Sequence, residues 1–446
     1  MRQPLRPISN RTAWWRHVPA AALILWVCLW CNLNSGFWNI VPPTSADTWQ
    51  LMVRAGLPFA VLPAACVVLL RRRKLHLSKT GPSRFLLYYG LFAAFSAIFS
   101  PQPLWSLYWS LNFIATILVA WTFVDRYAPL EFARQMLQVT WVGAFIVAAI
   151  IARQASGVIF GHATTAYGAV YQATEGLARS SGVARWAAVP GLVCLIRAYY
   201  SRRVIIIATY LGLAAVAFFI VYRMQSRGAV FGCAAALLFA LLVSSRMRRY
   251  ALPFAILSIV VILLLDSPAT LSQQVTDYLE RGQTRDEFLS MTGRTRAYEH
   301  GVTAFENAPL FGYGQWADRV TIYEHVHNSY LSALLNSGIV GAVPYLLSWV
   351  VGWVLFFKLQ KRRARLSPID RLCLVEAGTV MMFFTVRSIP ETTSAEFGVD
   401  LLVMVAIYVY LEVLAVSITR NKSRRPSPRL VDAGSFEKAF PLEPVA

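Results

Sequence analysis

The chain has 446 residues, of which 57% are hydrophobic and 14% are charged, and its formal net charge is +20. The charged fraction is well below the roughly 25% of soluble proteins, so the composition excludes an ordinary globular domain and indicates a membrane protein. The excess Lys and Arg residues lie in short runs between apolar stretches, which indicates membrane topology and excludes nucleic acid as a partner.

Apolar stretches along the chain predict about twelve transmembrane helices, because one span needs about 20 mostly apolar residues. In chain order they centre on residues 19–32, 51–70, 85–99, 104–124, 137–152, 186–199, 204–222, 229–243, 252–265, 339–357, 372–386 and 399–416. Backbone polar groups in lipid must be paired within helices. The expected fold class is therefore all-α, a polytopic membrane helix bundle.

Basic residues fall on alternate turns between these spans, which predicts that those turns and both chain ends are cytoplasmic. Two turns on the opposite side are long, residues 154–185 and residues 266–327. We expect a single polytopic domain over residues 1–421 that carries these two extracytoplasmic loops. Residues 422–446 are rich in Pro and charge, so they predict a disordered cytoplasmic tail.

The larger loop contains two segments with helical spacing of apolar residues, 271–280 and 294–307, which predict amphipathic helices. Residues 308–314 follow with Pro and Gly and should end the second helix. The only substantial hydrophilic stretch between the spans thus has structure of its own.

Four arginines on the extracytoplasmic side are candidates for anion binding. Arg223 and Arg227 join two spans on the side where the positive-inside bias disfavours cations, although Arg223 could simply reach lipid headgroups. Arg294 and Arg296 open the second amphipathic helix, where the helix dipole favours anions and guanidinium groups recognise phosphate. The alternative for both is a solvated loop arginine.

His325, His327 and Asn328 end the large loop just before a span. A histidine at such a junction can take a proton from a sugar hydroxyl near neutral pH, and the alternative is a hydrogen-bonded interfacial histidine. In an extended segment the two imidazoles would point to opposite sides, and no cluster of carboxylates or cysteines lies near them in sequence. We therefore expect no metal site here.

Three motifs resemble the O-antigen ligase superfamily, which includes lipopolysaccharide O-antigen ligases and related O-antigen and exopolysaccharide polymerases. The first is His327-Asn328, then nine residues, then the glycines at 338 and 341. The others are Arg294 with residues 306–314, and Arg227 between Ser226 and Gly228. Together they cover residues 226–341.

The resemblance implies a GT-C-like glycosyltransferase of the bacterial inner membrane that needs no cofactor and no metal. It would transfer a glycan, with inversion, from a polyprenyl (undecaprenyl) diphosphate carrier to an acceptor sugar hydroxyl on the periplasmic face. Arg227 and Arg294 would neutralise the diphosphate leaving group, and His327 would orient or deprotonate the acceptor. The other expected substrate contacts are Arg223, Arg296, Arg387, Glu391, Arg179 and Asn328.

Arg387 and Glu391 resemble a pattern of exopolysaccharide polymerases, although a capped helix end with an ion pair would look the same. Arg179 opens a similar polymerase-type loop, from which residues 183–186 depart. The leading function is thus a surface polysaccharide (exopolysaccharide or O-antigen) polymerase, and the alternative is a ligase that attaches polysaccharide to lipid A-core.

A lipid-linked oligosaccharide transporter or flippase is an alternative of another class, and a non-catalytic scaffold is a third. A transporter is disfavoured because ionisable residues lie at the ends of the apolar stretches, which are mostly uninterrupted. The expected partners are a polyprenyl-diphosphate-linked oligosaccharide, a glycan or lipid A-core acceptor and membrane lipids, with a flippase and a chain-length regulator as further proteins of the pathway.

Overall fold

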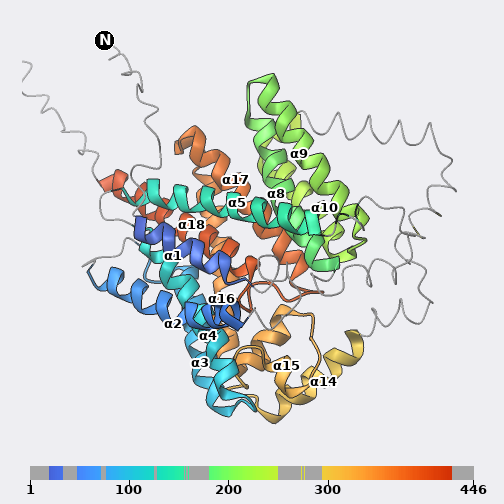
Figure 1. Ribbon diagram of the computed structural model, residues 1–446. Coiled ribbons are helices and arrows are strands. Elements are labelled where there is room, and N and C mark those ends of the chain that lie inside the picture. The colour runs from blue at the N-terminus through green and yellow to red at the C-terminus, as the bar shows by residue number, and fades with distance from the viewer. Residues whose placement is uncertain are drawn as a thin grey trace, which may run out of the picture.

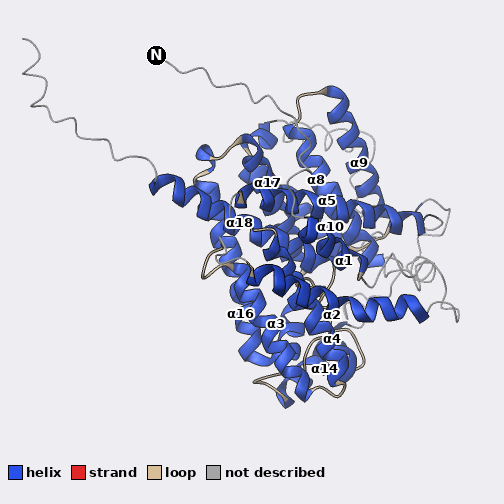
Figure 2. Ribbon diagram, turned by 60° about the vertical axis from the view of Figure 1, so that its left-hand side comes forward, coloured by secondary structure: helices blue, strands red, loops and turns tan. Residues whose placement is uncertain are grey.

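The computed structural model describes residues 20–33, 48–71, 77–124, 128–154, 180–249 and 294–423, with four single positions at 156, 159, 273 and 276. Every regular element in this part of the chain is helical (Figure 2). Six of the described helices are long and apolar enough to cross a membrane. The prediction of an all-α membrane protein is confirmed, whereas the count of twelve spans and the GT-C-like architecture stay predictions.

The described α-helices follow the predicted spans closely. They are α1 (Ala20–Cys31), α2 (Thr48–Leu70), α3 (Pro82–Ser96), α4 (Pro103–Thr122), α5 (Pro129–Gln154), α8 (Ser180–Tyr200), α9 (Val204–Arg223), α10 (Arg227–Val243), α14 (Arg294–Asn307), α15 (Ala317–Thr321), α16 (Ser329–Lys361), α17 (Pro368–Arg387) and α18 (Val399–Ser423). Short 3-10 turns, Ala97–Phe99 and Arg363–Arg365, follow α3 and α16.

Eleven of the twelve predicted spans coincide with one of these helices, and α14 coincides with the second predicted amphipathic helix. The remaining span at 252–265, the predicted helix at 271–280, Arg179 and residues 424–446 of the predicted tail lie outside the described residues.

Helix α18 forms the centre of the bundle (Figure 1). Every residue from 399 to 414 is buried, and the helix packs against α3, α4, α5, α16 and α17. A helix that is apolar all round has no preferred outer face, so enclosure is its stable position. By contrast, α9 exposes large apolar side chains such as Val204 and Ile205, as a helix facing lipid does.

Helix α16 is broken at Gly338, where φ is 57° and ψ is −167°. The preceding loop supplies the hydrogen bonds that the break removes. The N–H of Tyr313 donates to the carbonyl of Leu335 at 2.8 Å, and the N–H of Ile339 donates to the carbonyl of Pro309 at 2.9 Å. Residues 308–314 are therefore held by hydrogen bonds to the break in α16.

Two glycines permit this close approach. A Cβ at Gly338 would lie 2.2 Å from the carbonyl carbon of Leu310, and a Cβ at Gly312 would lie 2.4 Å from the carbonyl oxygen of Leu335. Both glycines have positive φ, which other residues rarely adopt. The glycine pattern that resembles the ligase superfamily thus has a packing function in this chain.

One expectation used against a transporter is wrong. Glu376 on α17 is fully buried and pairs with Arg197 on α8, with Oε1 to Nε at 2.7 Å, so ionisable groups also lie inside the bundle. Opposite charges are tolerated there because each compensates the other. The break in α16 at Gly338 lies one residue before the predicted span at 339–357, so it does not contradict the expectation that the spans are mostly uninterrupted. The choice of function must therefore rest on the geometry of the site.

Candidate active site

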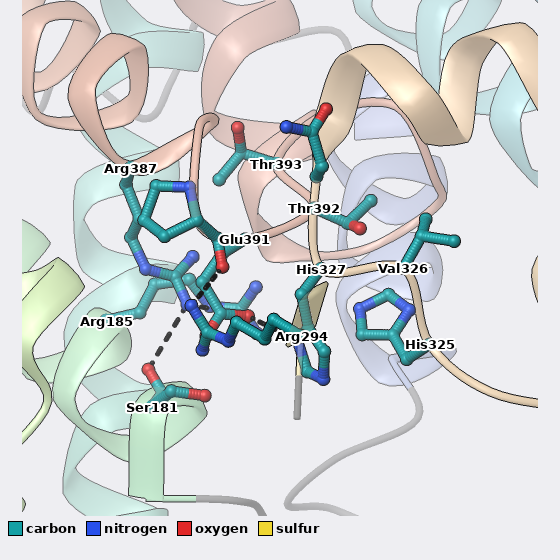
Figure 3. A network of polar contacts seen from close by, with 12 residues as sticks. Ser181, Arg185, Arg294, His325, Val326, His327, Arg387, Glu391, Thr392 and Thr393 are labelled. Carbon is teal, nitrogen blue, oxygen red and sulfur yellow. Dashed lines mark hydrogen bonds and ion pairs between the residues drawn. The ribbon is translucent and has the colours of Figure 1, made fainter. Parts of the chain in front are cut away.

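Side chains from three separate segments meet at one end of the bundle, next to α14 and α15 (Figure 1, Figure 3). Arg294 is the first residue of α14, His327 lies just before α16, and Glu391 lies in the loop between α17 and α18. The structure thus brings together residues up to 97 positions apart in sequence.

Glu391 is the centre of this group. Its Oε1 lies 2.7 Å from Nη2 of Arg294, and its Oε2 lies 3.2 Å from Nδ1 of His327 and 4.0 Å from Nη2 of Arg387. Burial alone would raise the pKa of Glu391, but the hydrogen bond with His327 and the charges of Arg387 and Arg294 hold it well below its usual range. Glu391 is therefore ionised and fixes all three neighbours.

Arg294 is held at two points. Besides Glu391, its Nη1 donates to the carbonyl oxygen of Pro390 at 2.6 Å. A quarter of the Arg294 side chain remains exposed. The guanidinium group is thus oriented from one side and reachable from the other, which suits an anion-binding residue.

His327 adopts a left-handed backbone conformation with φ of 47°. Burial lowers its pKa to about 4, although the hydrogen bond with Glu391 acts in the opposite direction. The imidazole is therefore neutral at neutral pH. Because the ionised Glu391 can only accept, Nδ1 carries the proton and the lone pair lies on Nε2.

The expectation that His325 and His327 point to opposite sides is wrong. Their ring centroids are 4.3 Å apart, because the left-handed turn at His327 breaks the alternation of an extended chain. Nδ1 of His325 lies 2.7 Å from Oδ2 of Asp318 on α15, which also accepts from the N–H of Val326 at 3.2 Å. Asp318 thereby fixes the segment that carries His327.

Carboxylates do lie beside both histidines, contrary to the expectation from sequence spacing. Two groups of three have ligand atoms within 4.8 Å of one another: His325 with His327 and Glu391, and His325 with Asp318 and Glu396. Each group could hold a metal ion by distance alone. A guanidinium group also lies beside each one, Arg294 on Glu391 and Arg319 at 3.8 Å from Asp318, which disfavours a cation.

Arg227 is the first residue of α10, which packs against α17. A Cβ at the next residue, Gly228, would lie 3.3 Å from Cγ of Pro390. The start of α10 therefore adjoins the loop after α17, which contains Glu391 and binds Arg294. Arg223 is half-buried, and its Nε donates to the carbonyl of Ile159 at 3.0 Å. Arg227 therefore lies near the site, and Arg223 is bonded to the backbone at Ile159.

Asn328 and Arg296 differ from the other candidates. The side-chain oxygen of Asn328 accepts from the N–H groups of Tyr330 and Leu331 at 2.9 Å each, and its Nδ2 donates to Ile389 at 2.9 Å. It therefore caps α16 and ties it to the loop after α17. Arg296 is exposed on α14. Sugar or phosphate contacts at these two residues stay predictions.

Sequence reasoning missed Arg185, Asp400 and Asp318. Nη1 of Arg185 on α8 lies 2.8 Å from Oδ2 of Asp400, and Nη1 of Arg387 lies 3.6 Å from the same oxygen. The available signal was an acidic residue within the first turn of an otherwise apolar span, which is costly unless it is paired.

Comparison with known families gives one match. Residues 211–346 match the family model described as O-antigen ligase. The match covers less than a third of the chain. The match contains Arg227, Arg294 and His327, so the resemblance drawn from their motifs is confirmed. No curated protein sequence matches the chain.

The residues that match the family model run from α9 into α16 and end before α17. Glu391, which orients Arg294 and His327, and the Arg185–Asp400–Arg387 group therefore lie outside the matched residues. The family supports an enzyme of the ligase or polymerase kind, embedded in a membrane.

Proposed function

We propose that the chain transfers a glycan from a polyprenyl diphosphate carrier to the hydroxyl group of an acceptor sugar on the extracytoplasmic face of a bacterial inner membrane. The observation that carries the proposal is that Arg294 and His327 share one buried carboxylate, Glu391, at distances of 2.7 and 3.2 Å. A guanidinium group that can bind an anion therefore lies beside a neutral imidazole that can act as a base.

The leaving group is a diphosphate, whose negative charge grows as the bond between the sugar C1 and the phosphate oxygen breaks. Arg294, fixed by Glu391 and Pro390, can donate to that oxygen without reorganising, and Arg227 at the start of α10 is the second candidate donor. Helix α10 also contributes its N-terminal dipole.

The acceptor hydroxyl would donate its proton to Nε2 of His327 while its oxygen attacks C1 from the side opposite the diphosphate. One bond forms as the other breaks, so the configuration at C1 inverts and the proton leaves on the imidazole. The bound diphosphate lies near His327 and raises the pKa of the imidazole, which makes it a stronger base during the reaction than in the free protein.

Chain growth is favoured over attachment to lipid A-core by Arg387 and Glu391. Both belong to the charge network, and both match the polymerase-like pattern in the sequence. Given a lipid-linked repeat unit as both donor and acceptor, a polymerase should yield products longer than one unit. A ligase should require the lipid A-core acceptor.

The test uses the purified full chain in proteoliposomes with polyprenyl diphosphate oligosaccharide, acceptor and a chelator. The wild type should form a new glycosidic bond, and His327→Ala and Arg294→Ala should lose about 99% or more of the rate. His300→Ala is the matched control, since His300 is a largely exposed histidine of α14.

Full activity in folded His327→Ala protein would contradict the proposal. Movement of the intact lipid-linked glycan between leaflets, without any new bond, would instead favour the transporter.

A further inference from the structure

Arg185, Asp400 and Arg387 form a second charged group beside Glu391. Figure 3 shows the two arginines of this group next to Glu391. They come from three helices: α8, the first turn of α18 and the last turn of α17. Oδ2 of Asp400 lies 2.8 Å from Nη1 of Arg185 and 3.6 Å from Nη1 of Arg387. One carboxylate thus separates two guanidinium groups that would otherwise repel each other.

Some N–H groups of these two guanidinium groups have no hydrogen-bond acceptor among the described residues around them. Arg387 is 1% exposed, and within the described part of the chain its Nε and Nη1 have no hydrogen-bond acceptor. Nε of Arg185 also lacks one. Buried donors are nearly always paired in folded proteins, so unpaired donors on a buried cation indicate a missing acceptor.

The first turn of α8 adjoins the same group. Nη2 of Arg387 donates to the carbonyl oxygen of Ser181 at 3.3 Å, and Arg185 lies one turn further along the helix. The N-terminal N–H groups of α8, a helix of 21 residues, and its dipole favour a negative group at this position.

The Arg185 side chain is 22% exposed, whereas Arg387 and Asp400 are almost fully buried. Arg185 is thus the member that can touch a ligand, and the other two hold it in place. Nη2 of Arg387 also lies 4.0 Å from Oε2 of Glu391, so the group is continuous with the proposed catalytic centre.

We propose that Arg185, backed by Arg387 and Asp400 and assisted by the first turn of α8, forms an oxyanion-binding subsite next to Arg294 and His327. The ligand chemistry is a phosphate or carboxylate group recognised by a guanidinium fork. Two sources fit: a phosphate of the lipid diphosphate, or the carboxylate of an acidic sugar in the glycan. This inference rests on the proposed glycan transfer.

The test is a binding titration of the full chain in lipid nanodiscs with two probes, geranylgeranyl diphosphate and tri-galacturonic acid. Arg185→Gln should weaken the binding of one probe by about tenfold or more, the effect of losing a charge-assisted hydrogen bond. Arg185→Lys should recover part of the loss, because it restores the charge without the fork. The probe that is affected identifies the source of the oxyanion.

Arg153→Gln is the matched control, because it removes another arginine charge, in the exposed last turn of α5. It should bind both probes as the wild type does. Wild-type affinity for both probes in a folded Arg185→Gln protein would overturn the proposal, as would a wild-type protein that binds neither probe.

The transfer reaction separates this proposal from the proposed function. If the wild type forms no glycosidic bond but Arg185→Gln still weakens binding, the function is wrong and the subsite stands. If transfer occurs and Arg185→Gln changes neither binding nor KM, the subsite is wrong and the function stands. The subsite predicts a raised KM for donor or acceptor with a smaller change in kcat.

Discussion

Replacing Glu391 with Gln preserves the size of the side chain but removes the charge that Arg294, His327 and Arg387 share. Glu391 is 7% exposed, and its Oε1 lies 2.7 Å from Nη2 of Arg294. The side chain of Arg294 is 25% exposed. Breaking a fully buried pair costs about 3–5 kcal/mol, and solvent access to Arg294 reduces this. We expect Glu391→Gln to lower the free energy of unfolding by about 2–3 kcal/mol at neutral pH.

The same change should slow glycan transfer. The carboxylate orients the His327 imidazole through Nδ1 and raises its pKa, so without it the base is misaligned and weaker. Positioned general bases contribute about 10²–10⁴ in rate, and we expect a loss of about 10² or more.

Thermal unfolding followed by tryptophan fluorescence, together with the transfer assay, measures both effects. Glu299→Gln, an exposed carboxylate on α14, is the control and should be neutral in both. The pH dependence gives a further check. Because the folded pKa of Glu391 is lowered, its stabilisation is present above the unfolded value of 4.5 and is lost as the pH falls below it. Wild-type stability and rate in Glu391→Gln would refute this account of the site.

Three further predictions follow from the same geometry. The rate constant kcat/KM should fall on the acid side of the pH profile near pH 4, because burial lowers the pKa of His327 to about 4. A fall near pH 6.5 instead would show that the imidazole is not the buried base. Gly338→Ala should lower the melting temperature and the activity, because its Cβ would lie 2.2 Å from Leu310, whereas Gly212→Ala, with nothing within 4 Å, should do neither. A chelator should leave transfer unchanged, and loss of activity restored by a divalent cation would place a metal at His325 or His327.

The sequence predicts the helices well because span length and apolarity are local properties. Eleven of the twelve spans and the amphipathic helix at 294–307 are present as helices. The break at Gly338 could not be predicted in the same way, since it depends on backbone hydrogen bonds between residues 308–314 and residues 335–340, more than twenty positions later. A glycine motif signals such a contact without saying where its partner lies.

The candidate site, too, could be predicted from the sequence only in part. Arg227, Arg294 and His327 stood out because each lies at an unusual place for its residue type, and Glu391 came with the resemblance. The directions of His325 and His327 depend on one left-handed dihedral angle, which spacing does not reveal. The pair Arg185–Asp400 joins residues 215 positions apart, so its partners meet only because α8 and α18 both pack against α5 and α17.

The most direct test of the central claim is a single turnover of purified protein with excess acceptor, followed by NMR of the anomeric linkage and quantification of released polyprenyl diphosphate. The proposed site predicts one diphosphate released for each bond formed, with an inverted configuration at C1 and no product from His327→Ala. Retention of configuration, or bond formation by His327→Ala at the wild-type rate, would contradict direct displacement by an acceptor bound at His327.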